Sequence, residues 1–149
     1  MIFELSDKLK NDRSFDLAYE EFQYYKLDSK PNEHPAPTRH TQEVYQGVNP
    51  FFGRDRFDKL NPVASALDIQ HVHFKQDDVI WTDSDGEQLA QWSCTSNSYL
   101  IYSYFQHNSE KYYYAIEFFV DAAHDLYEEN IERFIQMAAA YKNSIVQRD

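Results

Sequence analysis

Two histidines, His71 and His73, lie one residue apart in the segment 69–75, whose alternating side chains predict a β-strand. Side chains two positions apart on a strand point to the same side, here about 7 Å apart judged from the strand rise. Because an imidazole gains and loses a proton near neutral pH, one ring could act as a general base and the other as a general acid. The spacing therefore predicts two proton-transfer groups on one strand face.

An arginine and an aspartate, Arg54 and Asp55, occupy the polar stretch 53–56, which follows two phenylalanines and which we predict to be a turn. The planar guanidinium of arginine can hold a phosphate through two parallel hydrogen bonds. Asp55 would then orient Arg54 or one of the histidines. The alternative is that Gly53 simply makes the turn and that the two charges form a surface pair worth little energy.

Other polar residues are weaker candidates. His124 falls in the first turn of a predicted final helix, where it is either a base or an ordinary residue at a helix start. Thr95 and Ser96 could donate hydrogen bonds to a phosphate, although such residues before a strand usually form turns. The single cysteine, Cys94, has no partner for a disulfide, favours a reducing compartment and is expected to be buried rather than nucleophilic.

The histidine pair has two other interpretations. It could be a solvated strand face, or it could contribute to a metal site, because two histidines at this spacing are a common ligand pattern. A third ligand at a motif spacing is missing, and Asp77, Asp78 and His107 are no more than additions that could complete it. We therefore predict no metal and no cofactor.

The elements that must position these residues are predicted from hydrophobic periodicity. Residues 2–5 read as a first strand, and residues 14–26 as an amphipathic helix with Ser14 as its N-cap. The stretch 28–50 contains most of the prolines among polar residues and is predicted to be a long surface loop. Residues 79–81 form a possible short strand, and an Asp-Gly turn follows at 82–87.

The second half of the chain is richer in strand-forming residues. Residues 98–106 and 111–120 carry many tyrosines and predict an antiparallel hairpin, whose rings either stack bases or, as we favour, cover a half-buried sheet face. Residues 122–144 repeat apolar side chains at helical spacing, with Asp121 as a candidate N-cap. The order of the elements predicts an α+β fold, an antiparallel β-sheet with an N-terminal helix and a long C-terminal helix.

Composition narrows the class of protein. The 149 residues suit one domain, and no signal peptide or membrane span is visible, so a cytoplasmic protein is expected. The net charge of −11 opposes independent binding of nucleic acid, because phosphate contacts supply most non-specific affinity. Charge is nevertheless local, and three cations, Arg54, Arg56 and Lys59, cluster in the middle of the chain.

Several ordered segments resemble the YafO family of bacterial toxins, outside the proline-rich stretch. The matching pieces, in chain order, are Tyr25-Lys26, Phe52-Gly53-Arg54-Asp55, His71-Val72-His73-Phe74, Gln91-Trp92-Ser93 with Thr95, Leu100-Ile101-Tyr102, and His124-Asp125-Leu126 with Asn130 and Met137. The resemblance implies a RelE-like fold in a single toxin-like domain. It also implies a toxin of a toxin–antitoxin system, a ribosome-dependent endoribonuclease that cleaves mRNA in the ribosomal A site and is neutralised by its antitoxin.

Cleavage of RNA by internal transfer needs a base for the 2′-hydroxyl, an acid for the departing 5′-oxygen and a cation for the phosphorane. The resemblance gives these roles to His71, His73 and Arg54, with His124 as a further catalytic candidate. Asp55, Thr95 and Ser96 would then contact the substrate. The alternative is a non-enzymatic interaction module that keeps the toxin-like fold and binds proteins, which the acidic composition would suit.

Overall fold

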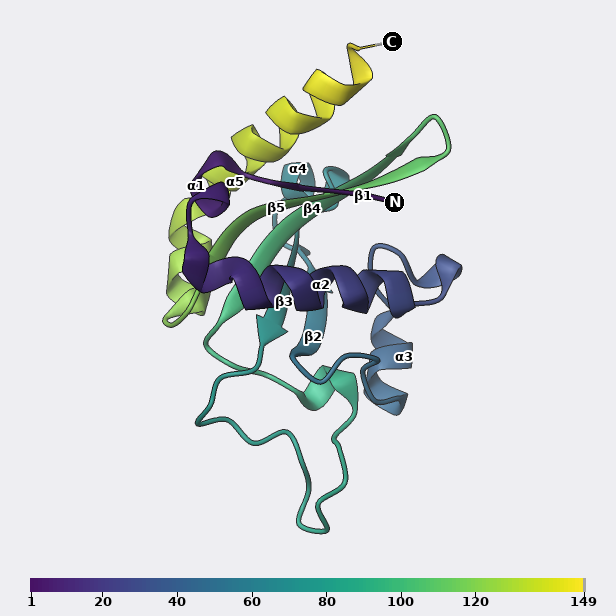
Figure 1. The fold of residues 1–149 in the computed structure, drawn as a ribbon, viewed down its shortest axis with the longest axis vertical. Coiled ribbons are helices and arrows are strands. Elements are labelled where there is room, and N and C mark those ends of the chain that lie inside the picture. The colour runs from purple at the N-terminus through teal and green to yellow at the C-terminus, as the bar shows by residue number, and fades with distance from the viewer. Residues whose placement is uncertain (149) are drawn as a thin grey trace.

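The structure, a computed structural model, describes residues 1–148 and contains one five-stranded sheet (Figure 1). The spatial order of the strands is β1-β5-β4-β3-β2. Their bounds are β1 (Ile2–Leu5), β2 (Phe52–Phe57), β3 (Gln70–Phe74), β4 (Tyr99–His107) and β5 (Glu110–Phe119).

Strand pairing confirms the predicted centre of the sheet. β3, β4 and β5 are antiparallel neighbours, and Asn108 and Ser109, both with positive φ, form the two-residue turn of the β4–β5 hairpin. β1 has the predicted bounds, but it pairs with β5 in parallel, from Ile2 opposite Tyr112 to Leu5 opposite Ala115. The sheet is therefore mostly antiparallel with one parallel edge that the sequence pattern did not predict.

Helices cover both faces of this sheet. α2 crosses one face, and α5 lies on the other and extends past it towards the C-terminus (Figure 1). The helices are α1 (Asp7–Lys10), α2 (Asp16–Asp28), α3 (Arg39–Val44), α4 (Pro62–Ala66) and α5 (Ala123–Val146), with 3₁₀ turns η1 (Arg13–Phe15), η2 (Pro31–Glu33) and η3 (Gln91–Ser93). Within residues 1–148, no helix is long and apolar enough to cross a membrane.

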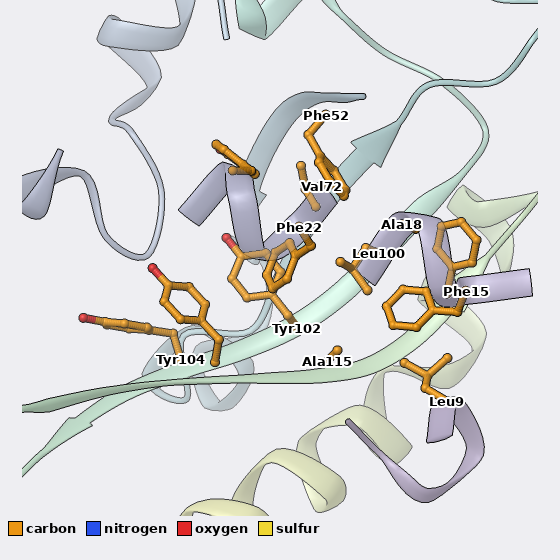
Figure 2. Packing of buried hydrophobic residues seen from close by; sticks show 13 residues of the cluster. Leu9, Phe15, Ala18, Phe22, Phe52, Val72, Leu100, Tyr102, Tyr104 and Ala115 are labelled. Atoms are coloured by element: carbon orange, nitrogen blue, oxygen red, sulfur yellow. The ribbon is translucent and has the colours of Figure 1, made fainter. Parts of the chain in front are cut away.

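Two hydrophobic cores hold the layers together. On the α2 side, Phe22 packs between Tyr102 and Phe52, with ring centroids 5.0 and 5.9 Å away (Figure 2). On the α5 side, Phe134 and Ala138 are buried against the sheet. The aromatic residues of the strands thus fill the interior, as the half-buried interpretation of the tyrosines predicted.

Both predicted N-caps are wrong. Asp12, not Ser14, accepts the backbone N–H that begins the 3₁₀ turn, and α2 starts at Asp16 without a side-chain cap. At α5 the N-cap is Ala122, in the left-handed region with φ of 54°, and no side chain caps it. In each case the helix begins one or two residues later than the periodicity indicates. The turn before it has apolar residues at the same three- and four-residue spacing as the helix, so the pattern does not mark the boundary.

Two loop predictions also need correction. The stretch 28–50 is not simply a loop, because Thr38 caps α3 within it and Gln42 of that helix is buried. The segment 79–81 forms no strand; a single bridge between Thr82 and Gln88 closes the turn that follows it. Short apolar runs such as this one do not distinguish a strand from an irregular segment.

The predicted turn at 53–56 is instead part of strand β2. Its backbone pairs with β3 on one side, and on the other the Arg54 N–H donates to the Cys94 carbonyl at 2.9 Å. A Cβ at Gly53 would stand 2.1 Å from that same carbonyl oxygen, so only glycine permits this approach. Gly53 therefore serves close packing rather than a turn.

Candidate functional site

The two faces of β2 present different side chains. Arg56 pairs with His71 of β3 and Asp55 pairs with Val72, and partners in an antiparallel ladder share a face. Arg54 and Arg56 therefore lie on the α5 side of the sheet with the histidines. Asp55 lies on the α2 side.

The histidines do point the same way, with ring centroids 5.8 Å apart. Tyr99 of β4 contacts both rings, at 4.5 Å from His71 and 4.6 Å from His73, and Tyr127 of α5 lies 5.1 Å from His71. His73 is only 6% exposed. The pair is therefore not a solvated strand face, because two tyrosines enclose it.

Burial keeps both imidazoles neutral. It lowers the pKa of His71 to about 3, and positive charge on His73 and Arg56 lowers this pKa further in the same direction. It lowers the pKa of His73 to about 4, against a backbone hydrogen bond at Ser96 and together with the charge of Arg54. The Ser96 N–H lies 2.8 Å from His73 Nδ1 and the Ser96 carbonyl oxygen lies 3.0 Å from it, so the Ser96 backbone occupies this ring nitrogen in either tautomer.

One nitrogen of this cluster is unsatisfied. His71 Nδ1 is buried and has no hydrogen-bond partner, a state that within residues 1–148 it shares only with the Tyr113 hydroxyl. A buried polar atom without a partner costs about 1–3 kcal/mol. Such costs in a native structure concentrate where a ligand or a reaction uses the group.

Two arginines border the histidines. The Arg54 guanidinium lies over the Trp92 ring, 4.4 Å from its centroid, and its Nε donates to the Trp92 carbonyl at 2.7 Å. Burial and the neighbouring Arg56 and Arg39 lower the pKa of Arg54. Among residues 1–148, neither Arg54 nor Arg56 forms an ion pair with a carboxylate. Their charge is available to an anion.

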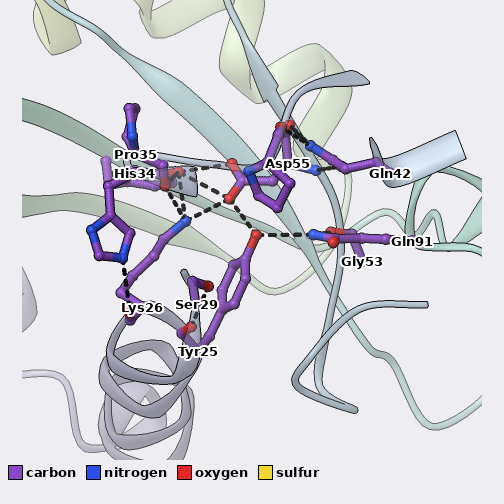
Figure 3. A network of polar contacts seen from close by, with 11 residues as sticks. Tyr25, Lys26, Ser29, His34, Pro35, Gln42, Gly53, Asp55 and Gln91 are labelled. Atoms are coloured by element: carbon purple, nitrogen blue, oxygen red, sulfur yellow. Dashed lines mark hydrogen bonds and ion pairs between the residues drawn. The ribbon is translucent and has the colours of Figure 1, made fainter. Parts of the chain in front are cut away.

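Asp55 does not orient Arg54 or a histidine, which corrects the sequence prediction. Its carboxylate accepts from Lys26 Nζ at 2.6 Å and from the hydroxyls of Tyr25 and Tyr102, each at 2.8 Å (Figure 3). Burial lowers the pKa of Lys26, while Asp55 acts against this shift. This buried network, on the opposite face from the arginines, belongs to the fold and leaves Asp55 no contact with substrate.

Of the remaining predicted residues, His124 lies near enough to His71 for its charge to lower the pKa of that ring. His124 is exposed in the first turn of α5, 3.6 Å from Asp125 and 3.8 Å from Glu128. The Ser96 hydroxyl donates to the Ser98 carbonyl, and the exposed Thr95 accepts from Trp81 Nε1 through its own carbonyl. Of the predicted site, Arg54, His71 and His73 share a face of the sheet, His124 lies near it on α5, and Ser96 contacts His73 through its backbone.

Sequence reasoning missed four neighbours of the site, Arg56, Trp92, Tyr99 and Tyr127. Arg56 was named only as one of three clustered cations, because its place beside Arg54 on one face requires the strand that replaces the predicted turn. The other three come from separate elements, and their positions follow only from the packing of η3, β4 and α5 around β2 and β3. Within residues 1–148, no three His, Cys, Asp or Glu side chains are arranged to hold a metal.

The chain is thus an acidic α+β protein with a cationic, histidine-bearing face on its sheet. The sequence profile described as Toxin YafO, type II toxin-antitoxin system, matches residues 23–143. The chain belongs to this family of toxins, which confirms the resemblance. Neither a curated protein nor a solved structure shows significant similarity to the chain.

Proposed function

We propose that this toxin is a ribosome-dependent endoribonuclease that cleaves mRNA in the ribosomal A site. The observation that carries the proposal is the placement of two arginines without carboxylate partners beside two enclosed histidines. Family membership supplies the setting, a type II toxin with a cognate antitoxin. A ribosomal target also implies action in the cytoplasm.

Arg54 and Arg56 would hold the scissile phosphate and stabilise the charge of the phosphorane. The 2′-oxygen attacks phosphorus and gives its proton to one histidine, and the bond to the 5′-oxygen breaks as that oxygen takes a proton from the other. The products are a 2′,3′-cyclic phosphate and a free 5′-hydroxyl. Because the Ser96 backbone occupies Nδ1 of His73, this ring would donate through Nε2 once it is protonated, and the partnerless Nδ1 of His71 suits the acceptor role.

A pKa near 3 or 4 makes each histidine a weak base in the free protein. The depression arises from burial and from nearby positive charge. A bound phosphate would neutralise the arginines and place an anion beside the imidazoles, and both changes raise a histidine pKa. Substrate binding would therefore bring the histidines towards the pH at which they exchange protons.

The ribosome would supply what the protein lacks. A net charge of −11 opposes long-range attraction to free RNA, so naked transcripts should bind weakly. Within the A site the mRNA is already held in place, and orientation alone can account for a large part of a rate enhancement.

A second candidate is a non-enzymatic interaction module that acts on translation by binding protein. The low exposure of His73 and the acids exposed along α5 favour it, because both suit protein binding more than catalysis. The two candidates differ in whether growth inhibition depends on RNA cleavage.

The test is expression without the antitoxin, followed by mapping of mRNA ends in vitro with and without ribosomes. We expect growth arrest, cleavage only with ribosomes, and loss of cleavage in His73→Ala with soluble, folded protein. Growth arrest without any new mRNA ends would favour the interaction module. Efficient cutting of naked RNA would contradict dependence on the ribosome.

A further inference from the structure

A pocket of about 200 Å³ opens at the outer edge of β2, away from the histidine rings. Residues 35–39 form one of its walls, and Arg56, Lys59 and Trp92 contribute to the others. Arg56 is common to this pocket and to the histidine cluster, so the two sites adjoin at strand β2.

The pocket is positively charged in a chain that is otherwise strongly negative. Arg39, Arg56 and Lys59 line it. Of its two acids, Asp55 turns its carboxylate into the interior, where Lys26 neutralises it, and Asp68 is exposed, so three cations face one exposed carboxylate. Arg39 forms an exposed ion pair with Glu43 of the same helix, with 2.6 Å between Arg39 Nε and Glu43 Oε1. An anion would therefore meet two cations without carboxylate partners and a third that is exposed.

The aromatic wall is held in a fixed position. The Trp92 carbonyl accepts from Arg54, and η3 rests against β2 where Gly53 meets Cys94. The indole carries one guanidinium 4.4 Å from its centroid and a second, that of Arg39, at 4.6 Å. Arg39 belongs to a six-residue helix and its side chain is about half exposed, so it can yield its place on the ring to another flat group.

We infer that this pocket is a binding subsite for single-stranded RNA, in which a base stacks on Trp92 and Arg39, Arg56 and Lys59 hold the adjoining phosphates. A flat ring beside several cations is the arrangement that recognises unpaired nucleotides through stacking and charge, without reading sequence. The inference rests on the proposed function, because Arg56 borders both sites and would contact the RNA between the pocket and the histidines.

The test is binding of a trinucleotide RNA with 2′-O-methyl groups, which internal transfer cannot cleave, followed by tryptophan fluorescence. The other tryptophan, Trp81, is 3% exposed and donates to the Thr95 carbonyl, so stacking in the pocket quenches Trp92 alone. We expect weak, saturable quenching, and about a tenfold loss of affinity in Trp92→Ala measured by NMR titration. Trp92→Phe, which keeps a ring, should lose less.

Charge is tested separately through salt. Lys59→Ala and Arg39→Ala should each reduce the slope of log affinity against log salt concentration by about 0.7, the value for one phosphate contact with a single strand. Lys30→Ala is the matched control, because this exposed lysine does not line the pocket. Equal affinity of Trp92→Ala and wild type, or an unchanged salt slope in both charge variants, would overturn the inference.

Two further outcomes separate the ligand and the proposed function from the subsite. Binding of adenosine monophosphate as tight as that of the trinucleotide would identify a free nucleotide as the ligand and contradict an RNA subsite. Loss of ribosomal cleavage in His73→Ala with trinucleotide binding intact would support both proposals. Trinucleotide binding by a protein that cleaves no mRNA on ribosomes would keep the subsite and reject the nuclease.

Discussion

Polar side chains on one face of strand β2 have their hydrogen-bond and charge partners, and those on the other face lack some of them. On the α2 face, Asp55 accepts from an ammonium and two hydroxyls, and Gln91 donates to Tyr25 and to the Gly53 carbonyl. On the α5 face, within residues 1–148, the arginines form no ion pair with a carboxylate and His71 Nδ1 has no hydrogen-bond partner. One strand thus supports the fold on one side and leaves binding capacity unused on the other.

The satisfied polar groups of the α2 face stabilise the fold, and the unsatisfied ones of the α5 face are available to a ligand. A buried ion pair contributes little net stability, because desolvation offsets the attraction, yet losing one partner is costly. The α2 face therefore fixes β2 in place without binding anything. A site must instead keep charges and hydrogen-bonding atoms unsatisfied, which lowers stability. Substitutions on the two faces should separate these effects.

The largest expected effect is on stability, from Asp55→Ala. The change leaves Lys26 buried without its counter-charge, so we expect a loss of about 3–5 kcal/mol in the free energy of unfolding. Urea denaturation followed by circular dichroism measures it. The double variant Lys26→Met, Asp55→Leu should recover much of the loss. A loss below about 1 kcal/mol in the single variant would mean that the network is not structural.

The second effect is on cleavage, from Arg54→Ala. Removal of one group that stabilises developing charge typically slows a reaction about 10²–10³-fold. We expect such a loss in ribosomal cleavage, and because the residue has no buried counter-ion, a much smaller loss of stability than for Asp55→Ala. Arg54→Lys is the control, since it keeps the charge without the two-pronged geometry. Cleavage at the wild-type rate in Arg54→Ala would remove this face from the site.

The third effect is on the dependence of stability on pH. The folded pKa values of about 3 for His71 and about 4 for His73 lie below the unfolded value of about 6.5. Between these limits the unfolded chain binds more protons, so stability falls as the pH decreases from about 6.5, by up to about 1.4 kcal/mol per pH unit for each histidine.

Urea titrations at pH 7, 6 and 5 measure this slope. His73→Gln should flatten it, whereas His40→Gln, a change at an exposed histidine, should not. An unchanged slope in His73→Gln would show that His73 is not held neutral by its surroundings.

The smallest effects on stability belong to two exposed candidates. Thr95 and His124 are exposed, so alanine at either position should change stability by no more than about 0.5 kcal/mol. Cleavage in Thr95→Ala should stay within about threefold of wild type. A hundredfold loss in that variant would move the site towards the loop that precedes β4.

Periodicity predicted the centre of the fold but not its edges. The hairpin and α5 carry many residues of one pattern, so their bounds came within one or two residues of the structure. β2 has a glycine and three charges in six residues, and its strand conformation depends on the Gly53–Cys94 approach and on the Asp55–Lys26 pair. Neither contact is visible in a local window.

The site was predicted in the same partial way. Strand alternation placed His71 and His73 on one side, which the structure confirms. It could not predict their burial, because that depends on where α5 lays Tyr127 against β3. The pairing of Asp55 with Arg54 followed from predicting a turn at 53–56, whereas in the strand that forms there adjacent residues face opposite ways.

The parallel pairing of β1 with β5 has a consequence for the newly made chain. Ile2 aligns with Tyr112, and the Ser6 N–H donates to the Ala115 carbonyl at 2.9 Å. The first strand to be synthesised must therefore wait, unpaired, until more than a hundred further residues have followed it. A contact between such distant residues forms late and slowly. Translation itself thus delays completion of the sheet at its β1 edge.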